Sequence, residues 1–201
     1  MTDISTALSE INVSLPGRII SYNSNSVRAV VQPTIPKRLA NGEVLNAPQI
    51  VNVPVMFPMT DINGAVAQVT LPVKSGDGCL LIFSQRSLEN WLSGSNDAPD
   101  DPRMFDLSDA FCIIGGNSRS PSADGENLCI KYGNGSIKLT PNGELIINAQ
   151  KTEITAISHT INGDVTLNGS ISASGDVTAG GISLKKHKHT GDSGGKTGGP
   201  E

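Results

Sequence analysis

The sequence predicts an all-β protein with two different kinds of β-structure, and three observations support this prediction. After the first dozen residues, no stretch shows the sustained i, i+3, i+4, i+7 apolar spacing of an amphipathic helix. Short apolar runs separated by turn residues fill residues 15–116, as expected for a small β-domain. Between residues 163 and 181, glycine recurs at every sixth position, which is typical of a solenoid or β-helix and not of a globule.

Composition narrows the possible functions. The chain has 201 residues, of which 37% are hydrophobic and 3% aromatic, and its formal net charge is −4. Phosphate binding requires concentrated Lys and Arg, so nucleic acid is not expected to be a partner. No run approaches the roughly 18 apolar residues that span a bilayer. The N-terminus also lacks the pattern of a signal peptide, so we expect a soluble chain that this route does not export.

Residues 1–14 are predicted to form a separate N-terminal segment. Ile4, Ala7, Leu8 and Ile11 recur at spacings of three and four, which suits a short amphipathic helix that docks on a neighbour. A frayed terminus fits the same residues equally well.

Residues 15–116 are predicted to form one barrel domain. Five runs are expected to be its strands: Arg18–Tyr22, Ser26–Gln32, Ile50–Val55, Val66–Leu71 and Cys79–Phe83. The first two flank the turn Asn23–Asn25 and predict a hairpin. Five strands in about a hundred residues suit a small Greek-key barrel of the OB type.

Four segments in this domain follow one another in an order that is specific to one family. They are Lys74–Phe83, Arg86–Trp91, Arg103–Ala110 and Ile113–Gly116. This order resembles the N-terminal OB-fold domain of the central spike, or membrane-piercing, proteins of contractile bacteriophage tails. The resemblance implies that residues 15–116 attach a spike to the baseplate hub and the tail tube.

Each of these segments also has a purely structural explanation. Gly76 and Gly78 suit turns, Trp91 suits a packed anchor, and Asp106 and Asp109 suit turn caps. No catalytic residue is therefore predicted in this domain.

The three cysteines are predicted to be reduced and packed. Cys79, Cys112 and Cys129 lie within or beside apolar runs and show no C-x-x-C spacing.

Residues 117–127, rich in Ser, Pro, Asp and Gly, are predicted to be a linker. Spike relatives that carry a cell-wall hydrolase have an enzyme domain at this place, and so short a linker cannot hold one. Strands are expected to resume beyond the linker, at Leu128–Tyr132, Ser136–Thr140, Glu144–Ala149, Thr152–Ile157 and Thr160–Asn162.

Residues 128–184 are predicted to form the spike. Its repeat has glycines at 163, 169, 175 and 181, with pairs of apolar residues such as Val165 and Leu167 or Ile171 and Ala173 between them. The alternation gives each strand one apolar face, and each glycine is expected to turn at positive φ or to pack closely. The apolar residues are too small and too few to close a core in one copy. We therefore predict an intertwined triple-stranded β-helix formed by a homotrimer.

Residues 185–201 are predicted to be a metal-binding tip. Two histidines separated by one residue on a strand, His187 and His189, point to the same side. Around a threefold axis they supply six imidazoles, an arrangement that suits iron, nickel or cobalt better than zinc. The tip of the resembled family carries a His-x-His pair, so the resemblance implies one iron ion per trimer, held by His187 and His189 of three chains.

The run Gly194–Gly198 is a poor phosphate loop, because it lacks the first glycine of that motif. We expect this run to let the tail fold back as a small apex.

The resemblance implies a structural function without enzymatic activity. The protein would be a baseplate central spike that pierces the host bacterial outer membrane, assembles in the host cytoplasm and resides in the virion at the tip of the tail. A spike of a related contractile injection machine fits the same residues.

A hexapeptide-repeat acyltransferase, with His159 at a subunit interface, is disfavoured because only about four clear repeats exist. His159 is otherwise expected to be a surface or packing residue. A carbohydrate-binding tail fibre would need exposed aromatic residues or a receptor-binding head at the C-terminus, and neither is visible in the sequence.

Overall fold

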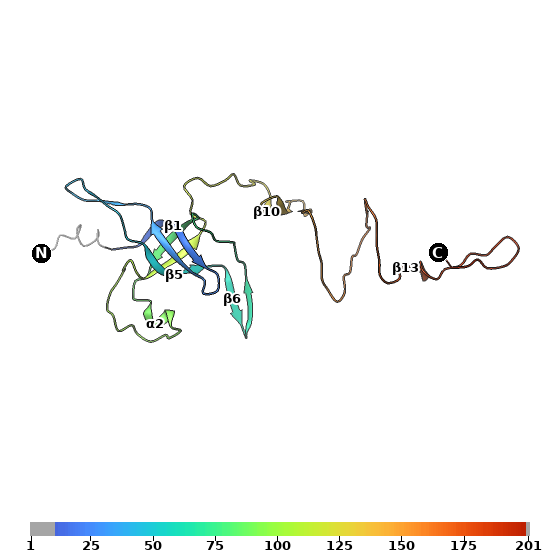
Figure 1. Cartoon of the computed structure of the whole chain (residues 1–201), viewed down its shortest axis with the longest axis horizontal. Helices are drawn as coiled ribbons and strands as arrows, with labels where there is room; N and C mark the ends of the chain where they lie inside the picture. Colours follow the sequence, from blue (N-terminus) through green and yellow to red (C-terminus); the bar gives the residue numbers. More distant parts are fainter. Residues whose placement is uncertain (1–10, 200–201) are drawn as a thin grey trace. The chain divides into compact units, whose positions relative to one another are not determined.

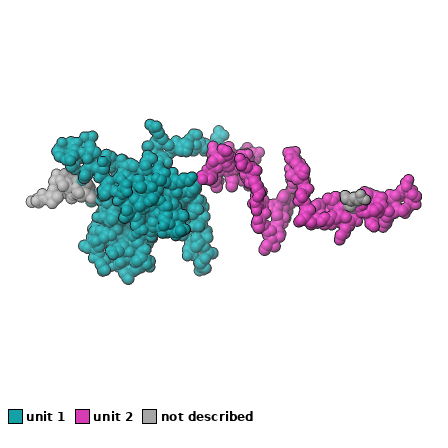
Figure 2. Space-filling view, viewed as in Figure 1, with its two compact units in different colours: residues 1–127 teal, residues 128–201 magenta. Residues whose placement is uncertain are grey.

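A computed structural model describes residues 11–199 of the chain (Figure 1). The chain divides into two compact units, residues 1–127 and residues 128–201, which Figure 2 shows in different colours. The helix predicted near the N-terminus falls on residues 1–10, apart from Ile11, and so lies outside the described residues. Among residues 11–199, no helix combines the length and the apolar character that crossing a bilayer requires.

Five strands close a barrel in the first unit. They are β1 (Ser14–Asn23), β2 (Arg28–Pro33), β5 (Ile50–Met56), β8 (Gly78–Phe83) and β9 (Ala110–Ile114). Around the barrel their order is β1-β2-β5-β9-β8; β5 and β9 run parallel, and the other neighbours run antiparallel. The predicted hairpin of the first two strands and the five-stranded, OB-like barrel are confirmed.

One of the five strands predicted for the barrel does not belong to it, so the prediction is wrong for that strand. Instead of joining the barrel, β7 (Ala65–Gln68) pairs with β6 (Met59–Ile62) in a separate two-stranded hairpin. The fifth barrel strand is β9, which contributes the buried Ala110 and Cys112, whereas Val66 is exposed. Both runs are apolar, so only the available partner strand decides which of them enters the barrel. A second hairpin outside the barrel consists of β3 (Lys37–Arg38) and β4 (Val44–Leu45).

The core of the first unit lies inside this barrel. Alternate residues of each strand point inward, as on β2, where Ala29 and Val31 are buried. The core consists of Ile19, Ala29, Val31, Ile50, Val53, Val55, Cys79, Leu81, Phe83, Ala110 and Cys112. Cys79 and Cys112 are free and buried, as predicted, and Cys129 is free and half-buried. A hydrogen bond to Cys79, together with burial, raises the pKa of Cys112, which keeps this thiol protonated.

Two glycines allow barrel strands to approach neighbouring segments of the chain closely. A Cβ atom on Gly17 would lie 2.7 Å from Cγ1 of Val31, so an alanine would force the barrel wall apart. A Cβ atom on Gly78 would overlap the carbonyl oxygen of Gly116. Gly78 therefore permits close packing and is not the turn residue that the sequence predicts, whereas Gly76, at a φ of 95°, is one.

A long excursion between β8 and β9, residues 84–109, contains the short helix α2 (Glu89–Leu92), which the sequence pattern does not reveal. The ring of Trp91 packs edge to face on Phe111, with 5.3 Å between the ring centroids. Trp91 thus anchors the excursion to the barrel as predicted, although half of its surface stays exposed.

Two aspartates organise the end of this excursion. Asp106 accepts the backbone N–H of Ser108 at 2.8 Å, which confirms a turn cap. Asp109 has a larger role, because the residue is 2% exposed and its carboxylate pairs with Arg103 at 2.6 Å and accepts the N–H of Leu88 at 2.9 Å. Hydrogen bonds to Asp109 and then to Asp101 raise the pKa of Arg103 above its usual value. An ion pair between the buried Asp109 and the partly exposed Arg103 therefore fastens the excursion, and sequence reasoning missed it.

The second unit begins with a three-stranded antiparallel sheet of β10 (Leu128–Tyr132), β11 (Gly135–Leu139) and β12 (Leu145–Asn148). The structure confirms these predicted strands within one residue at each end. Between them the chain turns at Gly133 and Gly143, whose φ values are 56° and 84°.

Residues 149–177 contain no helix and no strand in the single chain. The short strands predicted at Thr152–Ile157, at Thr160–Asn162 and in the first repeats are therefore not present in it. Of the four repeat glycines, 163 and 181 have positive φ, but 169 and 175 do not, and a Cβ atom at either would touch nothing within 4 Å. The trimeric β-helix is thus not evident in one chain, because its strands would have to pair with strands of other copies.

Candidate metal-binding apex

The repeat ends in a hairpin that brings Asp176 close to Ser183. The hairpin pairs β13 (Thr178–Ala179) with β14 (Ile182–Ser183). Its two central residues, Gly180 and Gly181, have φ values of 56° and 82°, the pattern of a type I′ turn. Because this turn needs positive φ at both central positions, the consecutive glycines specify where the hairpin forms.

The turn that leads into His187 is fixed by hydrogen bonds around Asp176. One carboxylate oxygen of Asp176 accepts the hydroxyl of Ser183, and the other accepts the backbone N–H of Lys185 at 3.1 Å. The hydroxyl oxygen of Ser183 in turn accepts a hydrogen bond from the N–H of Lys186 at 3.0 Å. The bonds from Ser183 and then Lys185 lower the pKa of Asp176, so the carboxylate that closes this turn is ionised.

The ring of His187 is held in one tautomer. Its Nδ1 atom lies 3.1 Å from the carbonyl oxygen of Ser183 and 3.0 Å from that of Leu184. A carbonyl oxygen only accepts hydrogen bonds, so Nδ1 must carry the hydrogen. In the neutral ring Nε2 is then unprotonated, and its lone pair is available to a metal ion.

The backbone of His189 is held by the tail that follows it. Its N–H donates to the hydroxyl oxygen of Thr197 at 3.0 Å, and its carbonyl accepts the N–H of Thr197, also at 3.0 Å. Thr190 and Lys196 form a β-bridge inside this loop. The tail folds back on itself as predicted, and the run from Gly194 belongs to a hairpin and not to a strand-to-helix phosphate loop.

The two imidazoles lie next to each other, with 5.1 Å between their centroids and 90° between their planes. The prediction of a strand through His187 and His189 is wrong, because residues 187–189 are irregular. The turn before them and the folded tail after them bring the rings together instead. Within residues 11–199, no three His, Cys, Asp or Glu side chains gather so that they could hold a metal ion. One chain offers two imidazole ligands, and a six-coordinate site needs more.

An apolar hollow of about 350 Å³ borders His187. Its lining includes Val177, Ile182 and Leu184, each of which is 45% to 65% exposed. The imidazole thus stands beside aliphatic surface that a single chain leaves open to water.

His159, the candidate for acyltransferase chemistry, takes no part in this site. It is exposed and lies within residues 149–177, which have no regular structure.

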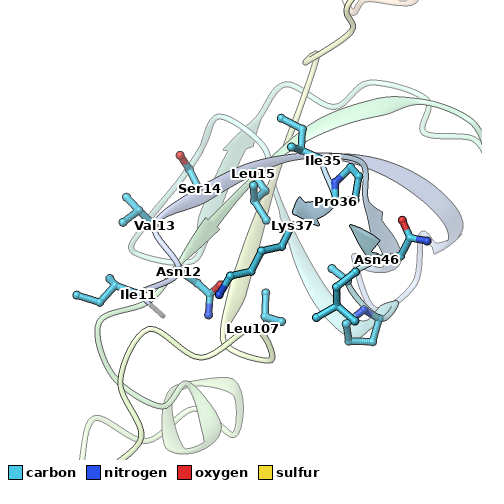
Figure 3. Close-up of a pocket in the computed structure, with 13 residues that line it drawn as sticks. Ile11, Asn12, Val13, Ser14, Leu15, Ile35, Pro36, Lys37, Asn46 and Leu107 are labelled. Carbon is cyan, nitrogen blue, oxygen red and sulfur yellow. The ribbon is translucent and has the colours of Figure 1, made fainter. Parts of the chain in front are cut away.

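The barrel unit has an apolar groove of its own, with a volume of about 440 Å³. Figure 3 shows the side chains of Ile11, Val13, Leu15, Ile35 and Leu107 around it. The lining is mainly aliphatic, so the groove offers a contact surface and not a set of reacting groups.

Sequence reasoning found the two histidines but missed Asp176, Ser183 and Thr197, which fix their positions. The paired glycines at 180 and 181 carry the signal that could have found the first two, because a two-residue type I′ hairpin centred there sets Thr178 opposite Ser183 and so brings Asp176 close. No comparable signal marks Thr197.

Comparison with known families bears on both ends of the chain. Residues 15–115, about half of the chain, match the phage protein Gp138 N-terminal domain. The chain belongs to this Gp138 family of phage proteins. Residues 181–201, which include both histidines, match the GpV Apex motif. Comparison with curated proteins gives no match.

The Gp138 and Apex matches place the protein in the phage tail, and hence in the virion. Both are families of phage tail spike proteins, which are structural and not enzymes. Together they indicate a role in the baseplate spike.

Proposed function

We propose that this protein is the central spike of a contractile phage tail and that, as a homotrimer, it pierces the outer membrane of the host bacterium. The observation that carries the proposal is the apolar surface between the two matched segments. In one chain, Val165, Ile171 and Val177 are 68%, 77% and 45% exposed. Because these residues recur every six positions, three copies wound about one axis would bury all of them in a shared core.

Stiffness is the mechanism that this assembly supplies. In an intertwined β-helix, the backbone N–H and C=O groups of residues 149–177 would pair between chains, and no sheet edge would remain free. Dense pairing between strands resists bending when the contracting tail drives the spike forward. The contact with the outer membrane is transient and needs no membrane-spanning helix.

The apex would hold one iron ion per trimer. Two imidazoles from each of three chains give six nitrogen ligands, which fill an octahedron. The free Nε2 atom of His187 fits this donor set, and no coordination position remains open for a substrate. The ion would join the three chain ends where the spike meets its load.

The barrel would connect the spike to the baseplate hub and the tail tube. The closed barrel needs no other chain to complete its core, so its outer surface is available for such contacts. Nucleic acid is not proposed as a partner.

Sedimentation and elemental analysis of the purified full chain test the proposal. We expect the mass of three chains and one iron per three chains. The double variant His187→Ala/His189→Ala should lose the metal and keep the trimer, because the apolar repeat is unchanged. A monomer at micromolar concentration would contradict the shared core. Three metals per trimer, or full metal content in the double variant, would contradict the shared site.

A further inference from the structure

Asp164 and Asp176 occupy the same place in two copies of the repeat, yet their surroundings differ. Each is the second residue of a Gly-Asp-Val-Thr sequence. The carboxylate of Asp176 accepts hydrogen bonds from Ser183 and Lys185, whereas within residues 11–199 Asp164 makes no side-chain hydrogen bond. The interactions of Asp176 therefore come from its position before the apex and not from the repeat itself.

The contacts of Asp176 lead to the ring of His187 in two steps. The carboxylate accepts a hydrogen bond from the hydroxyl of Ser183, and the oxygen of that hydroxyl accepts one from the N–H of Lys186. The carbonyl of Ser183 then accepts both the backbone N–H of His187 at 3.1 Å and its Nδ1–H at 3.1 Å. Ser183 thus donates its hydroxyl hydrogen to Asp176 and fixes the imidazole of His187 through its backbone carbonyl.

We propose that Asp176, acting through Ser183, is a positioning residue for the apex metal site. It holds the turn at residues 183–187 in the form that keeps the hydrogen of His187 on Nδ1 and leaves Nε2 free for the metal. This inference rests on the proposed metal site and adds to it a residue eleven positions before the first ligand. Without the carboxylate the turn loosens, and the imidazole exchanges between its two tautomers.

Metal affinity of the full chain gives the first test, with cobalt(II) as the probe because its visible spectrum reports the ligand set. Groups that orient metal ligands typically contribute about 10- to 100-fold to affinity, so Asp176→Ala should weaken cobalt binding by that factor. Asp164→Ala is the matched control and should bind like the unaltered chain. Ser183→Ala should resemble Asp176→Ala, whereas Ser183→Thr keeps the hydroxyl and should restore binding.

The tautomer of His187 gives the second test, which needs no metal. In ¹⁵N NMR of histidine-labelled protein before metal is added, the unaltered chain and Asp164→Ala should show His187 protonated at Nδ1. Asp176→Ala should show a mixture of the two tautomers, with an unchanged sedimentation coefficient. Equal affinity in Asp176→Ala and Asp164→Ala, or an unchanged tautomer in Asp176→Ala, would overturn the inference.

These outcomes can be told apart from the result expected if the proposed metal site does not exist. If the unaltered chain binds neither cobalt nor iron, the metal site itself is wrong, and the inference falls with it. If the unaltered chain binds metal and Asp176→Ala binds it equally well, only the positioning role is wrong.

Discussion

The barrel and the C-terminal repeat are both built from short β-forming segments, but they treat their apolar residues in opposite ways. In the barrel, Ile19, Val31 and Leu81 are fully buried. In the second unit, Ile130 and Ile171 are 67% and 77% exposed. Alternating apolar residues therefore specify which face of a strand is to be buried, but they do not specify which surface buries it. A sheet that closes on itself covers its own face, and an open one needs other chains.

The energetic consequence of this difference is large. Burying one Val, Leu or Ile side chain contributes about 1.5–3 kcal/mol. The barrel gains this contribution within one chain, so its stability should not depend on protein concentration. In the proposed trimer, the second unit gains this contribution on association, so its stability should depend on concentration.

The largest expected effect is on the proposed shared core of the repeat. Ile171→Asp would bring three carboxylates together in a dry interior, which costs several kcal/mol and should prevent assembly. Sedimentation of the full chain measures this loss. Ser172→Asp, on the opposite face, is the matched control and should leave the trimer intact. Equal behaviour of the two variants would remove the contrast between an inner and an outer face.

A smaller effect is expected inside the barrel. Leu81→Ala leaves a cavity in the core, which should lower the free energy of unfolding by about 2–5 kcal/mol. Urea denaturation of residues 1–116 measures it, and the midpoint should be the same at low and high protein concentration. A midpoint that rises with concentration would show that the barrel also depends on association.

The ion pair that fastens the excursion should also contribute to stability within one chain. Arg103→Ala leaves the 2%-exposed Asp109 without its partner, and breaking a buried pair in this way costs about 3 kcal/mol. Asp101→Asn removes the more exposed partner, which water screens, and should cost clearly less than Arg103→Ala. Urea denaturation of both variants checks the order, and equal losses would contradict the buried role of Asp109.

The smallest expected effect is the loss of the turn at residues 183–187 in acid. The pKa of Asp176 is lowered by hydrogen bonds from Ser183 and Lys185. Its contribution to the turn is therefore fully present above the unfolded-state pKa of about 3.9 and is lost only as the pH falls through the lower folded value. The amide signal of Lys185 should titrate with a midpoint below pH 3.9 or so in NMR. A midpoint at or above that value would show that the turn does not depend on the carboxylate.

Most strands could be predicted, because each is a short apolar run between turn residues. The hairpin around Asn23 and the three strands from Leu128 follow from local pattern and turn chemistry alone. The fifth barrel strand could not be assigned, because Val66 and Cys112 both lie in apolar runs and only one of these runs meets β5 and β8. The apex histidines were visible as a spaced pair, but the contacts that orient them were not.

By itself, the sequence determined the all-β character, the turns at paired glycines and the two histidines at the C-terminal end. These features depend on residues that lie within a few positions of one another. The tertiary structure decided that β9 completes the barrel, that Trp91 packs on Phe111, and that Asp109 accepts the N–H of Leu88. Such contacts depend on the folded path of the chain, because the hydrogen-bonding and packing groups that form them come together only after the intervening residues have turned back.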